Sequence, residues 1–266
     1  MRLCSIASGS SGNCIYVGSE TTHFLVDVGI SGKRIEAGLK ELDLCGKDLD
    51  GILITHEHTD HIAGLGVISR KFGVPIYASR GTIAAMKETA GLGNIDPDLF
   101  IEIEADRKKT VKDLTIHPMK ISHDAADPVA YRINYGNQKV AVCTDLGVYN
   151  DYTVECLRGL DAILIEANHD VNMLQVGPYP YYLKQRILGN RGHLSNENSG
   201  RLLSRILHDN MKGISLGHLS KENNMPELAY EAVRMEITMG DNPYNANDFY
   251  IQVAKRQEVS PVIQIR

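Results

Sequence analysis

Residues 55–61 place four potential metal ligands within six positions, directly after a predicted strand. The strand is predicted over Gly51–Thr55, and the segment that follows contains His56, His58, Asp60 and His61. A strand that runs into a loop can direct several side chains into one cleft. A single histidine is usually a packing residue, but three histidines and an aspartate this close together favour a metal site.

The ligand types indicate which metals such a site would take. Imidazole and carboxylate groups suit borderline divalent cations, with zinc or manganese favoured and iron also allowed. The five cysteines form no C-x-x-C pair, so the sequence has neither a disulfide framework nor a structural zinc knuckle. We expect these thiols to be reduced and mostly buried. A site without thiolates favours a catalytic metal.

Strand and helix patterns occur in two groups along the chain. The first group has strands at Leu3–Ala7, Cys14–Val17, Phe24–Val28, Gly51–Thr55 and Pro75–Ala78, with helices at 31–44, 61–72 and 82–90. The second has strands at Leu114–Ile121, Val129–Tyr135, Lys139–Cys143, Ala162–Glu166, Gly213–Leu216 and Phe249–Ala254, with helices at 152–160, 195–209 and 226–239. This order predicts an α/β fold, a four-layer αββα sandwich of two mixed sheets with flanking helices. No stretch resembles a linker, so we expect a single domain over residues 1–266.

Charge and hydropathy narrow the functional classes. The net charge of −5 is not that of a protein that grips nucleic acid through a broad basic face. Two bound divalent cations would add local positive charge, so nucleic acid stays open as a substrate. No segment approaches the roughly 18 consecutive apolar residues of a membrane span, and the first residues do not resemble a signal peptide. We therefore expect a cytoplasmic protein with no membrane partner.

The motif H-x-H-x-D-H after a strand resembles the metallo-β-lactamase superfamily, and the resemblance covers essentially the whole chain. The family pattern next requires a lone histidine, a carboxylate and a late histidine after successive strands, matched by His123, Asp145 and His218. The resemblance implies that one metal is bound by His56, His58 and His123. It implies that a second metal is bound by Asp60, His61 and His218, and that Asp145 bridges the two.

A closer resemblance rests on two segments with a common beginning, GHLSNEN at 192–198 and GHLSKENN at 217–224. In the ribonuclease Z and ribonuclease J branch, a histidine outside the ligand set precedes the last helix and strand and assists phosphodiester cleavage, and His193 matches it. With GSSGN at 9–13 and IEANHD at 165–170, the chain is similar to the YycJ (WalJ) group of exonucleases. The resemblance implies nucleic acid as substrate, DNA in preference to RNA.

The same resemblance implies a hydrolytic mechanism. Two neighbouring cations lower the pKa of a bridging water, and the resulting hydroxide is the nucleophile. We assign catalytic roles to Asp60, which would ligate and orient that hydroxide, and to His193, which would donate a proton to the developing oxyanion or the leaving oxygen.

Two other functions remain open. A small-molecule hydrolase, acting on a cyclic phosphate or a thioester, fits the acidic charge and the short connection between Asp145 and His193. That connection has about 50 residues, too few for an inserted clamp domain. A binding protein without activity would lack ligands, but every expected ligand position is filled.

Several residues near the motifs have two interpretations. Candidates for substrate binding are Ser11, Asn13, Ser195, Asn196 and Ser220, although the glycine- and serine-rich run at 8–13 is more typical of a tight turn than of a phosphate cradle. Glu166 and His169 either support His193 or cap the following segment. We expect Asp27 to bond loop amides, and Tyr179, Tyr181 and Tyr182 to fill a groove in preference to stacking on bases.

Overall fold

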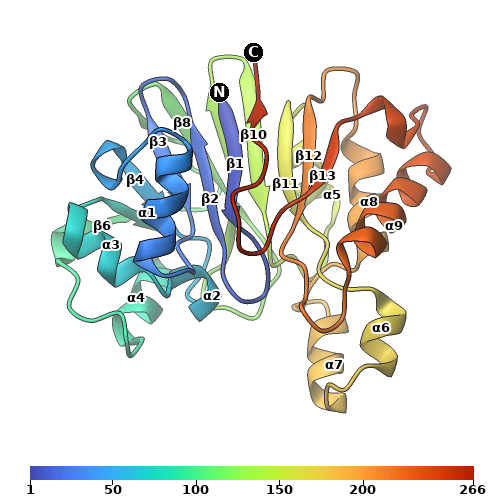
Figure 1. Cartoon of the computed structure of the whole chain (residues 1–266), viewed down its shortest axis with the longest axis horizontal. Helices are drawn as coiled ribbons and strands as arrows, with labels where there is room; N and C mark the ends of the chain where they lie inside the picture. The colour runs from blue at the N-terminus through green and yellow to red at the C-terminus, as the bar shows by residue number, and fades with distance from the viewer.

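Two seven-stranded sheets pack face to face, with helices on their outer surfaces (Figure 1). The computed structural model describes residues 1–266. The strand orders are β14-β1-β2-β3-β4-β5-β6 and β13-β12-β11-β10-β9-β8-β7. The predicted four-layer αββα fold with two mixed sheets is confirmed.

The first sheet combines an antiparallel and a parallel half. The antiparallel half contains β1 (Arg2–Ala7), β2 (Cys14–Gly18), β3 (His23–Val26) and β14 (Ile263–Gln264). Parallel pairing continues through β4 (Gly51–Leu53), β5 (Ile76–Ala78) and β6 (Phe100–Glu102). Helices α1 (Gly32–Glu41), α3 (Leu65–Phe72) and α4 (Arg80–Glu88) lie outside this sheet, and α2 (Thr59–Ile62) is a short turn after β4 (Figure 1).

The second sheet has the same mixed character. Its antiparallel half contains β7 (Lys109–Val111), β8 (Leu114–Lys120), β9 (Val129–Tyr135) and β10 (Gln138–Cys143). Parallel strands β11 (Ala162–Glu166), β12 (Gly213–Gly217) and β13 (Ile251–Val253) follow. Helices α5 (Asp151–Leu157), α8 (Asn196–Ile206) and α9 (Pro226–Met239) cover its outer face, while α6 (Val171–Val176) and α7 (Tyr181–Leu188) project below the sandwich (Figure 1).

Alternating side chains fill three hydrophobic layers. In β11, Ala162 and Leu164 face the layer between the sheets, whereas Ile163 and Ile165 face the helices. This is the two-residue period of a strand buried on both faces. Between the sheets, the buried Tyr131 hydroxyl donates to the Ile54 carbonyl at 2.6 Å, just before the histidine-rich loop. The core thus anchors the segment that carries the ligand motif.

The direction of the strands brings the predicted site residues to one edge of the second sheet. Strands β8 and β10 both run antiparallel to β9, and β11 and β12 run parallel to β10. Their carboxyl ends therefore lie at the same edge, where Glu166 ends β11 and His123, Asp145 and His218 follow the other strands. Ligands bind at such edges in many α/β folds because the loops converge there.

The structure differs from the sequence prediction mainly in short elements. Strand β13 is not the last one, because the chain returns to the first sheet and pairs β14 with β1. The edge strands β6 and β7 and the helix α6 were also not predicted, since segments of three to six residues show little periodicity. In place of one helix over 61–72 there are two, α2 and α3. None of the helices combines the length and apolar character needed to span a bilayer.

Candidate metal centre

The seven predicted ligands come together at the ends of the strands. One group is formed by His56, His58 and His123. His56 Nε2 lies 3.1 Å from His58 Nδ1, which lies 3.3 Å from His123 Nε2. Nitrogen atoms this close, from two separate loops, form a compact three-imidazole site.

A second group is formed by Asp60, His61 and His218. Asp60 Oδ2 lies 3.5 Å from His61 Nε2 and 3.3 Å from His218 Nε2. His218 comes from the loop after β12, so this group also joins the two sheets.

Asp145 lies between the two groups. Its Oδ1 is 3.6 Å from both His123 Nε2 and His218 Nε2, and its Oδ2 is 3.2 Å from His61 Nε2. Although Oδ2 is buried, it accepts no hydrogen bond. A buried carboxylate oxygen that accepts no hydrogen bond is stable only beside positive charge, which the His61 imidazolium or a bound cation would supply. The position of Asp145 is therefore suited to a bridging ligand.

Four of the five histidines in these groups are held through Nδ1, which leaves Nε2 facing the centre. His56 Nδ1 contacts Thr55 Oγ1 at 2.9 Å, and His61 Nδ1 contacts Asp27 Oδ2 at 2.7 Å. His123 Nδ1 lies 3.1 Å from the Gly192 carbonyl, and His218 Nδ1 lies 2.9 Å from Glu166 Oε1. Acceptors of this kind set the tautomer and the ring orientation of metal-binding histidines. In His58 it is Nδ1 that faces the other imidazoles.

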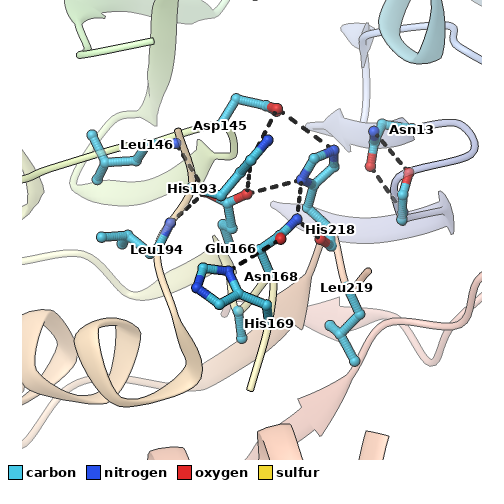
Figure 2. A network of polar contacts seen from close by, with 12 residues as sticks. Asn13, Asp145, Leu146, Glu166, Asn168, His169, His193, Leu194, His218 and Leu219 are labelled. Atoms are coloured by element: carbon cyan, nitrogen blue, oxygen red, sulfur yellow. Dashed lines mark hydrogen bonds and ion pairs between the residues drawn. The ribbon is translucent and has the colours of Figure 1, made fainter. Parts of the chain in front are cut away.

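Glu166 orients two histidines at once (Figure 2). Its Oε1 lies 2.7 Å from His193 Nδ1 and 2.9 Å from His218 Nδ1. Its Oε2 accepts from the backbone N–H groups of Leu146 and Leu194, at 2.9 and 3.3 Å. The carboxylate is fully buried and paired on both oxygens. Of the two interpretations of Glu166, the structure favours support of His193.

His193 lies at the rim of the centre, between Asp145 and Glu166 (Figure 2). Its Nδ1 is 3.6 Å from Asp145 Oδ1, and its side chain keeps 15% of its surface exposed. Burial by itself disfavours the imidazolium ion, but the Glu166 carboxylate raises the pKa of His193 above its usual value. This arrangement favours a protonated histidine that is open to solvent on one side.

Buried charges of opposite sign control the protonation of the other groups. Burial opposes ionisation of His218, yet Asp145, Asp60 and Glu166 raise its pKa to about 10. The pKa of His61 is raised as well, against the effect of burial, by Asp145, Asp27 and Asp60. Burial would raise the pKa of Asp145, but the surrounding imidazolium groups lower it well below its usual value. The carboxylates of the centre therefore require positive charge nearby.

Three residues of the site adopt the left-handed backbone conformation that favours glycine. The φ angles are 59° at Asp27, 59° at Asp145 and 54° at His218, each within two residues of the end of a strand. This conformation costs roughly 1 kcal/mol or more in a residue with a side chain. Here it turns each side chain sharply from its strand toward the centre.

The donor set fits divalent cations. It combines five imidazoles with two carboxylates and includes no thiol. Cys143, at the end of the strand before Asp145, packs in the hydrophobic layer beside the helices. Nitrogen and oxygen ligands of this kind suit zinc, manganese or iron. The buried, unpaired Oδ2 of Asp145 is consistent with the same conclusion.

Most of the predicted substrate-binding residues have internal partners. Asn13 is buried, its backbone N–H donates to the Asp60 carbonyl at 2.8 Å, and its amide lies 3.3 Å from His61 Nε2. Ser195 caps α8, Asn196 is buried against Asn224, and Ser220 bonds Asn223. Ser11 alone among the five candidates is exposed. The other four side chains stabilise the loops that carry the ligands.

The sequence interpretation missed part of the orienting network. Asp27 was expected to bond loop amides, and it does accept from the Thr55 N–H at 2.9 Å, but it also orients His61. Thr55 was not singled out as an orienting residue. His169 does not reach His193, and its Nδ1 lies 3.3 Å from Asn168 Oδ1. The one sequence signal for this role is the position of Asp27 directly after β3. Because β3 and β4 are neighbours in the sheet, Asp27 lies near the loop that carries His61.

Comparison with known proteins identifies the family. The profile of the beta-lactamase superfamily domain matches residues 22–211. The chain is 43% identical over 228 residues to the exodeoxyribonuclease YycJ of Bacillus anthracis, with 86% of each protein covered. It is 41% identical over 260 residues to the exodeoxyribonuclease WalJ of Streptococcus pneumoniae, with 98% of this chain and 96% of the relative covered. This chain belongs to the YycJ/WalJ family of the metallo-β-lactamase superfamily. The resemblance predicted from its motifs is confirmed.

Solved structures of the metallo-β-lactamase superfamily share the fold at low identity. The protein YhfI of Bacillus subtilis superimposes with a TM-score of 0.68 at 18% identity, over 97% of this chain and 98% of that one. Zinc-bound PqqB of Methylobacterium extorquens gives a TM-score of 0.71 at 16% identity over all of both chains. These likenesses support the sheet order described above.

Replacing Glu166 by glutamine should weaken metal binding. The amide keeps the size of the side chain but removes its negative charge. If its oxygen faces His193 and His218, its NH₂ group faces the N–H donors of Leu146 and Leu194 in place of Oε2. We expect roughly 10- to 100-fold lower affinity for zinc or manganese, the usual effect of removing a histidine-orienting group. Competition with a chelator would measure it, with Glu155→Gln on the exposed face of α5 as the matched control. Equal affinity in both variants would contradict the orienting role.

Metal binding should release protons. A cation competes with the protons on His61 and His218, and their raised pKa values keep both groups protonated in the metal-free protein at neutral pH. We therefore expect the apparent metal affinity to rise as the pH rises from mildly acidic to mildly alkaline. Titration calorimetry in two buffers of different protonation enthalpy would count the protons. Binding enthalpies that do not depend on the buffer would show that these histidines are already neutral.

Proposed function

We propose that this metal-dependent hydrolase is a DNA exonuclease that cleaves phosphodiester bonds at a centre of two divalent cations. The observation that carries the proposal is the position of His193. Glu166 Oε1 bonds His193 Nδ1 and holds the ring beside the ligand groups. A histidine placed this way suits a proton-transfer step at a cation site. The two relatives reported above are 41–43% identical to this chain, and both are named exodeoxyribonucleases. Their names support DNA as the substrate.

Each ligand group would hold one cation. We assign His56, His58 and His123 to the first cation, and Asp60, His61 and His218 to the second, with Asp145 shared between them. Zinc or manganese are the best candidates, and iron is compatible. When bound, the cations supply positive charge for the phosphodiester and acidify the attacking water. Asp60, whose side chain is 27% exposed, would orient that water.

His193 would act as the general acid. Glu166 occupies Nδ1 and favours the protonated ring, so the proton on Nε2 is available to the leaving oxygen. Such a transfer commonly contributes about 10²–10⁴-fold to the rate. Ser11, in the exposed turn between β1 and β2, remains the candidate for direct substrate contact among the residues proposed from sequence.

A small-molecule hydrolase is the second candidate, because the net charge is −5 and the connection between β11 and α8 holds only two short helices. The two functions differ in their substrates. We would remove bound metal, restore manganese or zinc, and assay 5′-phosphorylated DNA, bis(p-nitrophenyl) phosphate and a thioester. We expect DNA and the phosphodiester to be cleaved, with loss of activity on renewed metal removal. Activity confined to the thioester would exclude the nuclease.

Replacing His193 by alanine should separate catalysis from metal binding. Neither of the two groups assigned to a cation above contains His193, although His193 also lies in a further cluster with Asp145, Glu166 and His218 that could hold a metal. Because Glu166 occupies its Nδ1, we expect the variant to keep its metal content and lose about 10²–10⁴-fold in kcat on DNA. Elemental analysis and single-turnover assays would measure the two quantities. His117→Ala is the matched control, since His117 lies on β8 and its Nε2 is 4.0 Å from Asp106 Oδ1. Loss of metal from the His193 variant would instead make it a ligand.

A further inference from the structure

Two tyrosines project from the connection between β11 and α8. Helix α7 begins at Tyr181, and residues Tyr181 and Tyr182 are 77% and 74% exposed. The sequence favoured groove filling for these residues, and the exposure corrects that prediction. Large aromatic side chains on a protein surface are typical of binding sites, where they offer contact area at a small cost in side-chain entropy.

The charge of this connection differs from that of the whole chain. Residues 171–192 contain Lys184, Arg186 and Arg191 and no aspartate or glutamate, whereas the chain as a whole carries −5. Lys184 donates to the Gln175 carbonyl at 2.7 Å, which holds it at the surface between α6 and α7. A positive segment with exposed aromatic rings is complementary to a nucleic acid strand, whose phosphates are anionic and whose bases have flat faces.

The connection is attached directly to the metal centre. Arg186 Nη2 donates to Asp124 Oδ1 at 3.1 Å, beside the proposed ligand His123. Arg191 Nε donates to the His123 carbonyl at 3.1 Å, and the Ser122 hydroxyl donates to the Asn190 carbonyl at 2.8 Å. These bonds join the end of α7 to the loop after β8. A nucleic acid strand bound to α7 would therefore lie next to the centre.

The helical spacing places Tyr182 on the same face of α7 as Arg186. Tyr182 and Arg186 are four residues apart in α7, so they share a face of the helix. Arg186 bonds Asp124, and the backbone of Tyr182 lies about one helical turn, roughly 5 Å, from that of Arg186 along this face. That separation is comparable to the length of a single nucleotide step.

We propose that α7 binds the single-stranded segment of DNA that leads to the metal centre. Bases would stack on Tyr181 and Tyr182, while Lys184 and Arg191 would contact the phosphates. The inference rests on the proposed nuclease function and adds the element that positions the strand. It would also allow an acidic protein to bind DNA, because this segment carries basic residues and no acidic residue of its own.

The test compares a polymeric substrate with a small one. In the metal-loaded full-length protein, the double variant Tyr181→Ala/Tyr182→Ala should raise KM for an oligonucleotide with a single-stranded end by roughly tenfold or more, the effect of losing base stacking. The kcat/KM for bis(p-nitrophenyl) phosphate should not change, because that molecule is too small to span α7 and the centre. The double variant Tyr181→Phe/Tyr182→Phe keeps the rings and should retain the oligonucleotide KM.

Controls separate this proposal from the proposed function. Tyr250→Ala removes another tyrosine that is 50% exposed, next to β13, and should leave both substrates unaffected. If the wild-type protein degrades DNA and the alanine pair keeps the wild-type KM, the role of α7 is refuted while the nuclease stands. If the wild-type protein degrades no DNA, both are refuted. A loss with the phenylalanine pair as large as with the alanine pair would also refute stacking.

Discussion

The structure depends on the burial of the Asp145 carboxylate at the junction of the two sheets. A buried carboxylate is stable only with positive charge and hydrogen-bond donors around it, because burial strongly disfavours an isolated charge. Asp145 lies within 3.6 Å of nitrogen atoms in His61, His123 and His218, which belong to three separate loops. The two sheets must therefore pack in one arrangement for this charge to be compensated, and cations held there would complete the compensation.

A set of acceptors around the histidines makes this arrangement specific. Asp27 and Glu166 are both fully buried, and each hydrogen-bonds the Nδ1 atom of a histidine that faces the centre. The backbone tolerates left-handed φ angles at Asp27, Asp145 and His218 because these contacts over-determine their positions. Gly29 contributes in another way, since a Cβ atom there would lie 1.6 Å from the Asp60 carbonyl oxygen. The loop that carries Asp60 and His61 can approach β3 this closely only past a glycine.

The division of labour across the chain follows from this architecture. The sandwich core holds the ligand loops, as the bond from the Tyr131 hydroxyl to the Ile54 carbonyl illustrates. The connection over 171–192 carries α6 and α7 and projects from the sandwich (Figure 1). Outside the packed core, it can carry exposed side chains such as Tyr181 and Tyr182. A protein of net charge −5 can still carry positive charge locally, since residues 171–192 contain three basic residues and no acidic one, and bound cations would add to it.

The amino-acid sequence by itself determined the fold class and the residues that meet at the centre. Apolar runs such as β11 and the histidine-rich segment after β4 are local patterns, and local patterns are visible in a single chain. The resemblance to the metallo-β-lactamase superfamily then implied His123, Asp145 and His218 as the remaining ligands. The orienting network was decided only by the tertiary structure, because its partners are distant in sequence: 34 positions separate Asp27 from His61, and 52 separate Glu166 from His218. Pairing of β14 with β1 is a similar long-range event. The same reason explains why Asn196 is buried against Asn224 while Tyr181 is exposed, since burial depends on which distant segment packs over a residue and not on the residue itself.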